Sequence, residues 1–501
     1  MNKPAKIATA VAVALGLAYP ATAWLLGKQV ESALDAQYQQ LSEQPYIKVV
    51  ERSFERGVFH STELVTFELN GELLSALARA GEEEAATTDA PVEPVRFTVR
   101  SEIAHGPLPG LRTIGAATAE AGLVLDEAAK AQLAKVFGDA APLQLKTVYG
   151  FSGGGSTTLT SPGFKTTVPA KDGGERHVSW QGLKFTVDFT RHMQRYSMQG
   201  EAPGLEIEDG AAHVVVSGIR MSGDQSRVFE DEPLLYAGTQ KITIDEVRMT
   251  PRAAAAAGEG GEKAEPLLLK QVAYDVSSPA KGEFIDISAK FGAETVQVGA
   301  QDYGPAHYDL SLNHLHARTL AKLSRAVMSM YSEEALRQAK QGQTAFALAA
   351  LAEPARELLA HDPEISIDRI SFRSPHGDAT MALRVRTNQL SPDDLQNPFV
   401  LIGKLDVTGN ASLPEGLIAD MQKDEAGSAE EAARRVDLQL AGYAAQGLVQ
   451  REQGFVKSAL EFRGGELKIN GKPVNPFALG AAAGSDSAAH AQSGSLTAPA
   501  Q

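Results

Sequence analysis

Residues 150–154 read Gly-Phe-Ser-Gly-Gly and fit the Gly-x-Ser-x-Gly pattern of a serine-hydrolase nucleophile elbow, with Ser152 as the candidate catalytic residue. The elbow requires a strand before the serine and a helix after it, because the start of the helix positions the backbone donor for an oxyanion. The segment from Leu143 to Tyr149 is typical of a strand. The residues after Ser152 are three glycines, several β-branched residues and then Pro162, which favour a turn into a second strand. We therefore predict a glycine-rich hairpin turn here and no nucleophile.

Two histidines, His314 and His316, are the candidate metal ligands. On a strand both side chains would lie on one face, and Asp309 is near in sequence. A third ligand does not follow at a recognisable spacing, and the pair precedes an expected helix, where polar side chains commonly cap. Carboxylates over residues 362–368 offer a pair for hydrolysis, but the sequence assigns them no roles. We therefore predict no metal and no cofactor.

The bulk composition narrows the class of protein. The chain has 501 residues and a formal net charge of −15, with no cysteine, 43% apolar residues and 6% aromatic residues. A negative chain without a dense run of Lys and Arg repels phosphate backbones, so we predict no nucleic-acid partner. The absence of cysteine excludes disulfides, thiolate nucleophiles and cysteine-based zinc sites. At about 150 residues per domain, the length predicts roughly two to four compact units.

The N-terminus carries the strongest pattern. Lys3 and Lys6 precede an apolar run over residues 7–26, which as a helix rising ~1.5 Å per residue covers the ~30 Å hydrocarbon core of a bilayer. We predict a signal-anchor over residues 1–27; the alternative is a signal peptide cleaved after Ala21-Thr22-Ala23. The basic side would stay in the cytoplasm. The prediction is therefore a single-pass protein of the bacterial inner membrane with most of its chain in the periplasm.

After the apolar run, most of the chain alternates apolar and polar residues. Residues 28–45 have the helical spacing of a stalk, and the chain after it alternates apolar and polar residues with a period of two, as in Leu183, Phe185, Val187 and Phe189. Turn residues separate these runs, so we expect successive antiparallel hairpins. The predicted fold class is β-rich α+β, with one transmembrane helix and then an extended, mostly antiparallel sheet of hairpins covered by helical insertions.

Three helical insertions interrupt the predicted sheet. Helices are expected over residues 126–137, over residues 315–359, and after Ser428, whose spacing to Glu431 is that of a capping box. Two segments have the composition of linkers. We predict these linkers at residues 81–94 and 253–266. The predicted domains are a β-rich half at 46–252, a second β-rich half with helical insertions at 267–478, and a disordered tail at 479–501.

Several short segments resemble one known family. They are "FERGVFHS" at residues 54–61, "HGPLP" at 105–109, "GFSGGGST" at 150–157 and "GELKINGKPV" at 465–474. Together with the basic start and the apolar helix, and in this order, they resemble the YdgA family of bacterial inner-membrane-anchored periplasmic proteins over nearly the whole chain. That family is a domain of unknown function. The resemblance implies an anchored topology and a shared glycine-rich turn, and it implies no activity, cofactor or catalytic residue.

These observations predict a non-enzymatic binding or scaffolding protein of the cell envelope. In one version the sheet presents an apolar face to a lipid or another hydrophobic ligand. An envelope hydrolase that uses Ser152 or a carboxylate pair is the alternative. The partners left open are a lipid, an envelope protein and a second copy of the chain, which would form a homo-oligomer through the stalk helix or the helix near Leu320.

Overall fold

The computed structural model describes residues 3–42, 46–71, 94–170, 174–252, 265–332, 344–391, 393–394, 397–423 and 428–475. The chain falls into two compact units: unit 1 comprises Met1–Ile285 and His316–Ala355, and unit 2 comprises Asp286–Leu315 and Arg356–Gln501. Both are mostly antiparallel sheet with few helices. The linkers predicted over 81–94 and 253–266 and the tail predicted over 479–501 lie outside the described residues, apart from Pro94, Glu265 and Pro266.

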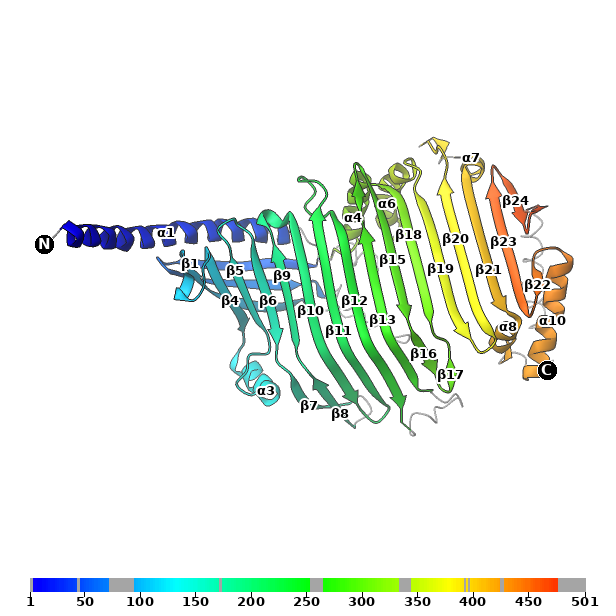
Figure 1. The fold of residues 1–501 in the computed structure, drawn as a ribbon, viewed down its shortest axis with the longest axis horizontal. Coiled ribbons are helices and arrows are strands. Elements are labelled where there is room, and N and C mark those ends of the chain that lie inside the picture. The colour runs from blue at the N-terminus through cyan, green and yellow to red at the C-terminus, as the bar shows by residue number, and fades with distance from the viewer. Residues whose placement is uncertain are drawn as a thin grey trace, which may run out of the picture. The chain divides into compact units, whose positions relative to one another are not determined.

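Unit 1 is built from antiparallel strands joined by turns, which Figure 1 shows side by side. Each strand from β1 to β6 pairs with the next, and the ladder continues through β9, β10, β11, β12 and β13. The β7–β8 hairpin joins this ladder where β8 pairs with residues 205–208 of β10. The described elements are α1 (Lys3–Ser42), β1 (Ile47–Arg56), β2 (His60–Leu69), β3 (Val95–His105), η1 (Pro109–Leu111), β4 (Ala117–Val124), α3 (Glu127–Phe137), β5 (Gln144–Tyr149), β6 (Gly155–Ser161), β7 (Phe164–Pro169), β8 (Glu175–Trp180), β9 (Leu183–Phe189), η2 (Arg191–Met193), β10 (Arg195–Glu208), β11 (Ala212–Arg227), β12 (Tyr236–Pro251), β13 (Leu267–Ser278), β14 (Ala280–Lys281) and α4 (Ala317–Ser329).

The period-two alternation sorts the side chains of this sheet onto two faces, because successive residues of a strand point to opposite sides. One register row crosses seven strands, from β5 to β13, through Leu145, Leu159, Phe185, Gly200, Met221, Ile242 and Tyr274. The adjacent row on the opposite face is Lys146, Thr158, Thr186, Gln199, Ser222, Lys241 and Asp275. We call the first row the apolar row and the face that carries it the apolar face.

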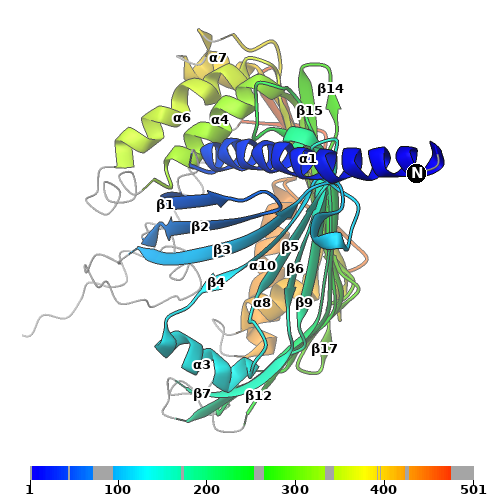
Figure 2. The same ribbon diagram turned by 90° about the vertical axis from the view of Figure 1, so that its left-hand side faces the viewer.

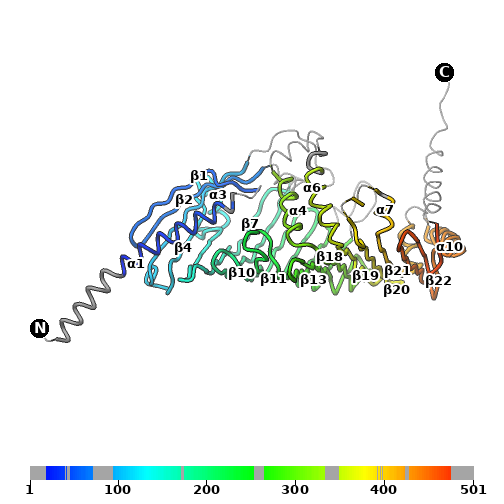
Figure 3. Tube along the Cα trace, turned by 90° about the horizontal axis from the view of Figure 1, so that it is seen from above, coloured from blue at the N-terminus to red at the C-terminus, as the bar shows by residue number. Residues whose placement is uncertain are grey.

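Helix α1 covers one end of the apolar face. Val30 and Leu34 form a buried cluster with Ile103 of β3 and Ala117 of β4. Figure 2 shows α1 and α3 on the same side of the curved sheet of unit 1, and Figure 3 shows α1 crossing the first strands from above. The helix predicted over residues 28–45 is therefore present as far as Ser42, residues 43–45 lie outside the described residues, and the apolar stripe of the helix packs on the sheet.

The predicted transmembrane helix is wrong. Among the residues that the structure describes, no helix is long and apolar enough to cross a membrane. The end of the apolar run belongs to the folded unit: the Tyr19 hydroxyl donates to the carbonyl oxygen of Leu108 at 2.9 Å, and Ala23 is buried. This finding contradicts the single transmembrane helix of the predicted fold class and the predicted placement as a single-pass protein of the inner membrane.

Unit 2 is a second antiparallel ladder, in the order β18, β19, β20, β21, β23, β24 and β25. Val436 and Leu440 of α10 pack against Val456 of β23 and form its buried cluster. Three elements have residues in both units: β15 (Phe284–Ala293), α6 (Thr344–Leu359) and β18, whose last residue, His316, belongs to unit 1. The remaining elements are β16 (Thr295–Val298), β17 (Gln301–Asp302), β18 (Ala306–His316), β19 (Glu364–Ser374), β20 (Gly377–Thr387), α7 (Pro398–Gly403), β21 (Leu405–Pro414), α8 (Glu415–Met421), α10 (Ala429–Ala445), β22 (Gln450–Glu452), β23 (Phe455–Arg463), β24 (Glu466–Ile469) and β25 (Lys472–Val474).

The predicted helical insertions are present, and their capping residues explain where two of them begin. The Asp126 side chain accepts from the backbone N–H of Ala129 at 2.7 Å at the start of α3. The Ser428 hydroxyl accepts from the backbone N–H of Glu431 at 3.2 Å at the start of α10. The block predicted over residues 315–359 contains α4 and α6. The short helices α7 and α8 were not predicted.

Candidate functional site

Ser152 lies in the turn between β5 and β6. The backbone N–H of Gly150 donates to the carbonyl oxygen of Gly154 at 2.8 Å, and Gly153 has a φ of 84°, a left-handed conformation that glycine adopts without strain. Strand β6 follows the turn directly. The predicted hairpin turn is therefore confirmed, and without a helix start the oxyanion donor of a nucleophile elbow is not positioned at Ser152.

The two candidate metal ligands have separate surroundings. His314 has a φ of 59°, which interrupts strand alternation, and its backbone N–H donates to Asp286 Oδ1 at 2.9 Å. His316 Nδ1 lies 2.8 Å from Thr319 Oγ1 at the start of α4. Throughout the part of the chain that the structure describes, no three His, Asp or Glu side chains gather as a metal site requires.

The candidate carboxylates over residues 362–368 are engaged in local contacts. Asp362 Oδ1 accepts from the backbone N–H of Leu390 at 3.2 Å. Glu364 Oε1 accepts from the side-chain amide of Asn313 at 3.3 Å and forms an ion pair with Arg384 at 3.5 Å. These contacts hold the strands and turns in place, and they do not set two carboxylates opposite each other.

Solvent reaches the apolar face beyond α1. Leu145 and Tyr274, at the two ends of the apolar row, are 36% and 41% exposed, and Phe185 and Met221 between them are half-buried. Under α1, by contrast, Ile103 is 1% exposed. Since adjacent strands lie about 4.8 Å apart, a row over seven strands extends roughly 29 Å. The face therefore offers a long apolar surface that is only partly covered.

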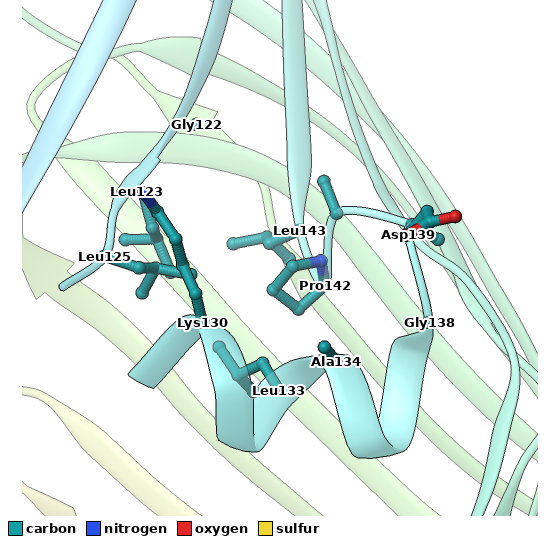
Figure 4. Close-up of a pocket in the computed structure, with 12 residues that line it drawn as sticks. Gly122, Leu123, Leu125, Lys130, Leu133, Ala134, Gly138, Asp139, Pro142 and Leu143 are labelled. Carbon is teal, nitrogen blue, oxygen red and sulfur yellow. The ribbon is translucent and has the colours of Figure 1, made fainter. Parts of the chain in front are cut away.

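A pocket of about 310 Å³ lies between α3 and the strand ends of β4 and β5. Figure 4 shows its leucines pointing into the space between the helix and the strands. Ligand pockets are typically of this size, mostly apolar, and carry a few polar groups. The lining also contains two charged residues, Asp139 and Lys130, and Lys130 is paired with Glu127 at 2.8 Å. The apolar lining consists of Leu123, Leu125, Leu133, Ala134, Pro142 and Leu143.

The opposite, polar face has a pocket of about 490 Å³. Lys184, Glu201 and Arg220 lie in one register row there, and Arg220 forms an ion pair with Asp245. Charges of alternating sign neutralise one another across the strands. The polar face therefore has the charge pattern of a solvent-exposed sheet surface.

A buried Ser–His contact lies beneath α1. His105 is 1% exposed; its Nδ1 lies 2.8 Å from the carbonyl oxygen of Ala23, and its Nε2 lies 3.0 Å from Ser61 Oγ. A carbonyl oxygen only accepts, so Nδ1 carries the hydrogen and Nε2 accepts from the Ser61 hydroxyl. Burial lowers the pKa of His105 and favours its neutral form. Because α1 covers both side chains, the contact serves to dock the helix.

Glu63 is the second buried polar group under α1. It is 1% exposed, and its carboxylate accepts from Arg52 Nε at 2.7 Å and from the Tyr38 hydroxyl at 3.1 Å. Burial, followed by the Glu63 charge, raises the pKa of Tyr38. Arg52 also pairs with Asp35 of α1. An ionic network therefore holds the helix on the sheet in addition to its apolar stripe.

Sequence reasoning missed these docking residues, because Ser61 and His105 are 44 residues apart in the chain. One signal was present. Ser61 and Glu63 share the strand period of Val65 and Phe67, so two polar residues stand where the alternation calls for apolar ones. A buried polar residue needs a partner, and that requirement points to a contact from elsewhere in the chain.

Comparison with known proteins yields one match. A family model described as a bacterial protein of unknown function (DUF945) matches residues 1–477. The narrower YdgA name is compatible with that description. Neither a curated protein nor a solved structure matches the chain.

Proposed function

Because the chain belongs to a family of bacterial proteins of unknown function, DUF945, its role has to be inferred from its geometry, and we propose that it binds an acyl-chain lipid on the apolar face of unit 1 without catalysing a reaction. The observation that carries the proposal is the apolar row, which crosses seven strands on one face. Four of its side chains are half-buried (Leu159, Phe185, Met221 and Ile242), Leu145 and Tyr274 at its ends are exposed, and β10 contributes Gly200. Exposed apolar surface of this extent is typical of binding sites.

The chemistry of the face favours an acyl chain over a peptide. Strands β9 to β12 pair on both sides, so their backbone N–H and C=O groups are used within the ladder and cannot bind an added strand. An extended peptide on this face would leave its own backbone groups without partners, which costs free energy. An acyl chain has no polar groups along its length and needs none.

The affinity expected from burial is moderate. Each buried methylene contributes about 0.8 kcal/mol, so about eight methylenes against the face contribute roughly 6 kcal/mol. That free energy corresponds to a Kd of roughly 40 µM. The pocket beside α3, which Leu123 of β4 lines, adds apolar area at one end of the same face.

Photo-crosslinking of the full chain with a diazirine-bearing fatty acid tests the proposal. Crosslinks are expected on peptides from β9 to β12. A matched pair of variants on adjacent residues of β11 separates the two faces: Met221→Glu places a charge in the apolar row, and Ser222→Glu places the same charge on the polar face. We expect Met221→Glu to lower crosslinking about tenfold or more and Ser222→Glu to match the wild type. Equal crosslinking in the two variants would contradict the proposal.

A further inference from the structure

An arginine without an acidic partner stands at one end of the apolar face. Arg227 and Met221 occupy the same face of β11, six residues or about 20 Å apart, and Arg227 pairs with Tyr236 in the register of β11 and β12. Tyr196 of β10 stands beside them, with its ring centroid 5.1 Å from that of Tyr236. Beyond the apolar row, this end of the face is therefore polar and positively charged.

The contacts of Arg227 leave its charge uncompensated. Its Nη2 donates to the carbonyl oxygen of His192 at 2.7 Å and to the Tyr236 hydroxyl at 3.3 Å, and both acceptors are neutral. Its Nε is buried without a hydrogen-bond partner. Within the described ranges, no carboxylate pairs with Arg227. A buried guanidinium donor normally has a partner, so one is missing here.

Two other arginines of unit 1 differ from Arg227 because each has an acidic partner. Arg195 pairs with Asp224 at 2.7 Å on the polar face, and Arg318 of α4 pairs with Asp231 at 2.9 Å. These charges are neutralised by their neighbours. Arg227, in contrast, contacts only neutral acceptors among the described residues, so its charge favours an anion as the partner.

The Tyr196 hydroxyl provides a second donor. It has no hydrogen-bond partner in the described part of the chain, while the Tyr236 hydroxyl donates to the carbonyl oxygen of Met193 at 2.8 Å. Burial raises the pKa of Tyr196, so the phenol keeps its hydrogen near neutral pH. An anionic oxygen beside Arg227 can therefore accept hydrogen bonds from two side chains.

We infer that Arg227 and the Tyr196 hydroxyl receive the anionic headgroup, a carboxylate or phosphate, of a lipid whose acyl chain runs along β11 toward Met221. One leaflet of a bilayer is about 15 Å of hydrocarbon, so an acyl chain that starts at Arg227 covers most of the path of about 20 Å toward Met221. The guanidinium fork matches the geometry of both headgroups. The inference rests on the proposed lipid-binding function and adds the class of ligand.

Binding of three single-chain ligands with the same acyl chain tests the inference on the full chain: a fatty acid, the fatty alcohol and a monoacyl glycerophosphate. In the wild type, an anion should bind about tenfold more tightly than the alcohol, or better, since hydrogen bonds to charged groups are the stronger ones. The fatty acid and the glycerophosphate distinguish a carboxylate site from a phosphate site, and free inorganic phosphate shows whether the headgroup binds without the chain.

The variants separate recognition from structure. Arg227→Gln keeps a donor for His192 but removes the charge, so the preference for the anion should fall to about one while the alcohol still binds. Arg227→Lys should restore part of the preference, and Arg195→Gln on the polar face should leave it unchanged. Equal binding of anion and alcohol by the wild type would overturn the inference and leave the lipid-binding proposal standing. Binding of none of the ligands would overturn both.

Discussion

Glu63→Ala is expected to weaken the docking of α1 by about 3 kcal/mol. Glu63 is 1% exposed and accepts from Arg52 Nε at 2.7 Å and from the Tyr38 hydroxyl at 3.1 Å. Removing one partner of a buried ion pair costs about 3–5 kcal/mol, because the other charge is left without compensation. Arg52 keeps its contact with Asp35, so the lower end of this range applies.

The fluorescence of Trp24 reports the weakened docking of α1. Trp24 belongs to α1, and the guanidinium of Arg56 lies 5.1 Å from its ring centroid. The chain has two tryptophans, so a Trp180→Phe background leaves Trp24 as the single probe. Urea m-values are about 1–3 kcal/mol/M, so a loss of about 3 kcal/mol lowers the unfolding midpoint by roughly 1–3 M.

Glu68→Ala on the same strand is the matched control. Glu68 pairs with Arg96 at 2.7 Å, and the Arg96 side chain is 62% exposed. Exposed ion pairs contribute about 0–1 kcal/mol, so the midpoint should move much less. If Glu63→Ala and Glu68→Ala shift the midpoint by the same small amount, the reasoning about a buried network is refuted.

Three further predictions follow from single contacts. Gly27→Ala places a Cβ 2.7 Å from the His105 ring and should destabilise α1 by about 1–3 kcal/mol, whereas Gly442→Ala in α10 meets nothing within 4 Å and should stabilise its helix by about 0.5–1 kcal/mol; hydrogen exchange of the two helices measures both. Because burial lowers the pKa of folded His105, the unfolded chain takes up a proton first as pH falls below about 6.5. The free energy of unfolding measured in urea titrations should therefore drop below this pH. His105→Gln should remove the drop, and His177→Gln, which changes an exposed histidine, should not. Fluorophosphonate should label neither the wild type nor Ser152→Ala above background. Labelling of the wild type that disappears in Ser152→Ala would restore the hydrolase hypothesis.

The local part of the fold was predictable from the sequence. Alternation at Leu183, Phe185 and Val187 indicates a strand, because its period matches the pleat, and β9 is that strand. The spacing from Ser428 to Glu431 indicates a helix start, because the hydroxyl satisfies a backbone donor. These patterns depend on neighbours in the chain, so a single sequence contains them.

The N-terminal helix shows where such patterns fail. An apolar run over residues 7–26 is suited both to lipid and to a protein surface, and its length and the basic residues before it favoured a membrane. The surface that the helix contacts decides between the two. Ala23 is buried against the sheet of unit 1, and the first strand of that sheet begins more than twenty residues later in the sequence. The Arg227 site was missed for the same reason, since its features depend on strand register and on Tyr196 from another strand.

The central claim is that the apolar face of unit 1 binds an acyl chain. Native mass spectrometry of the intact chain and of Met221→Glu, each measured as purified and after incubation with a fatty acid, tests it most directly. The account predicts a lipid-mass adduct on the wild type that is lost or strongly reduced in Met221→Glu. An unmodified mass for the wild type under both conditions, or the same adduct on both proteins, would contradict it.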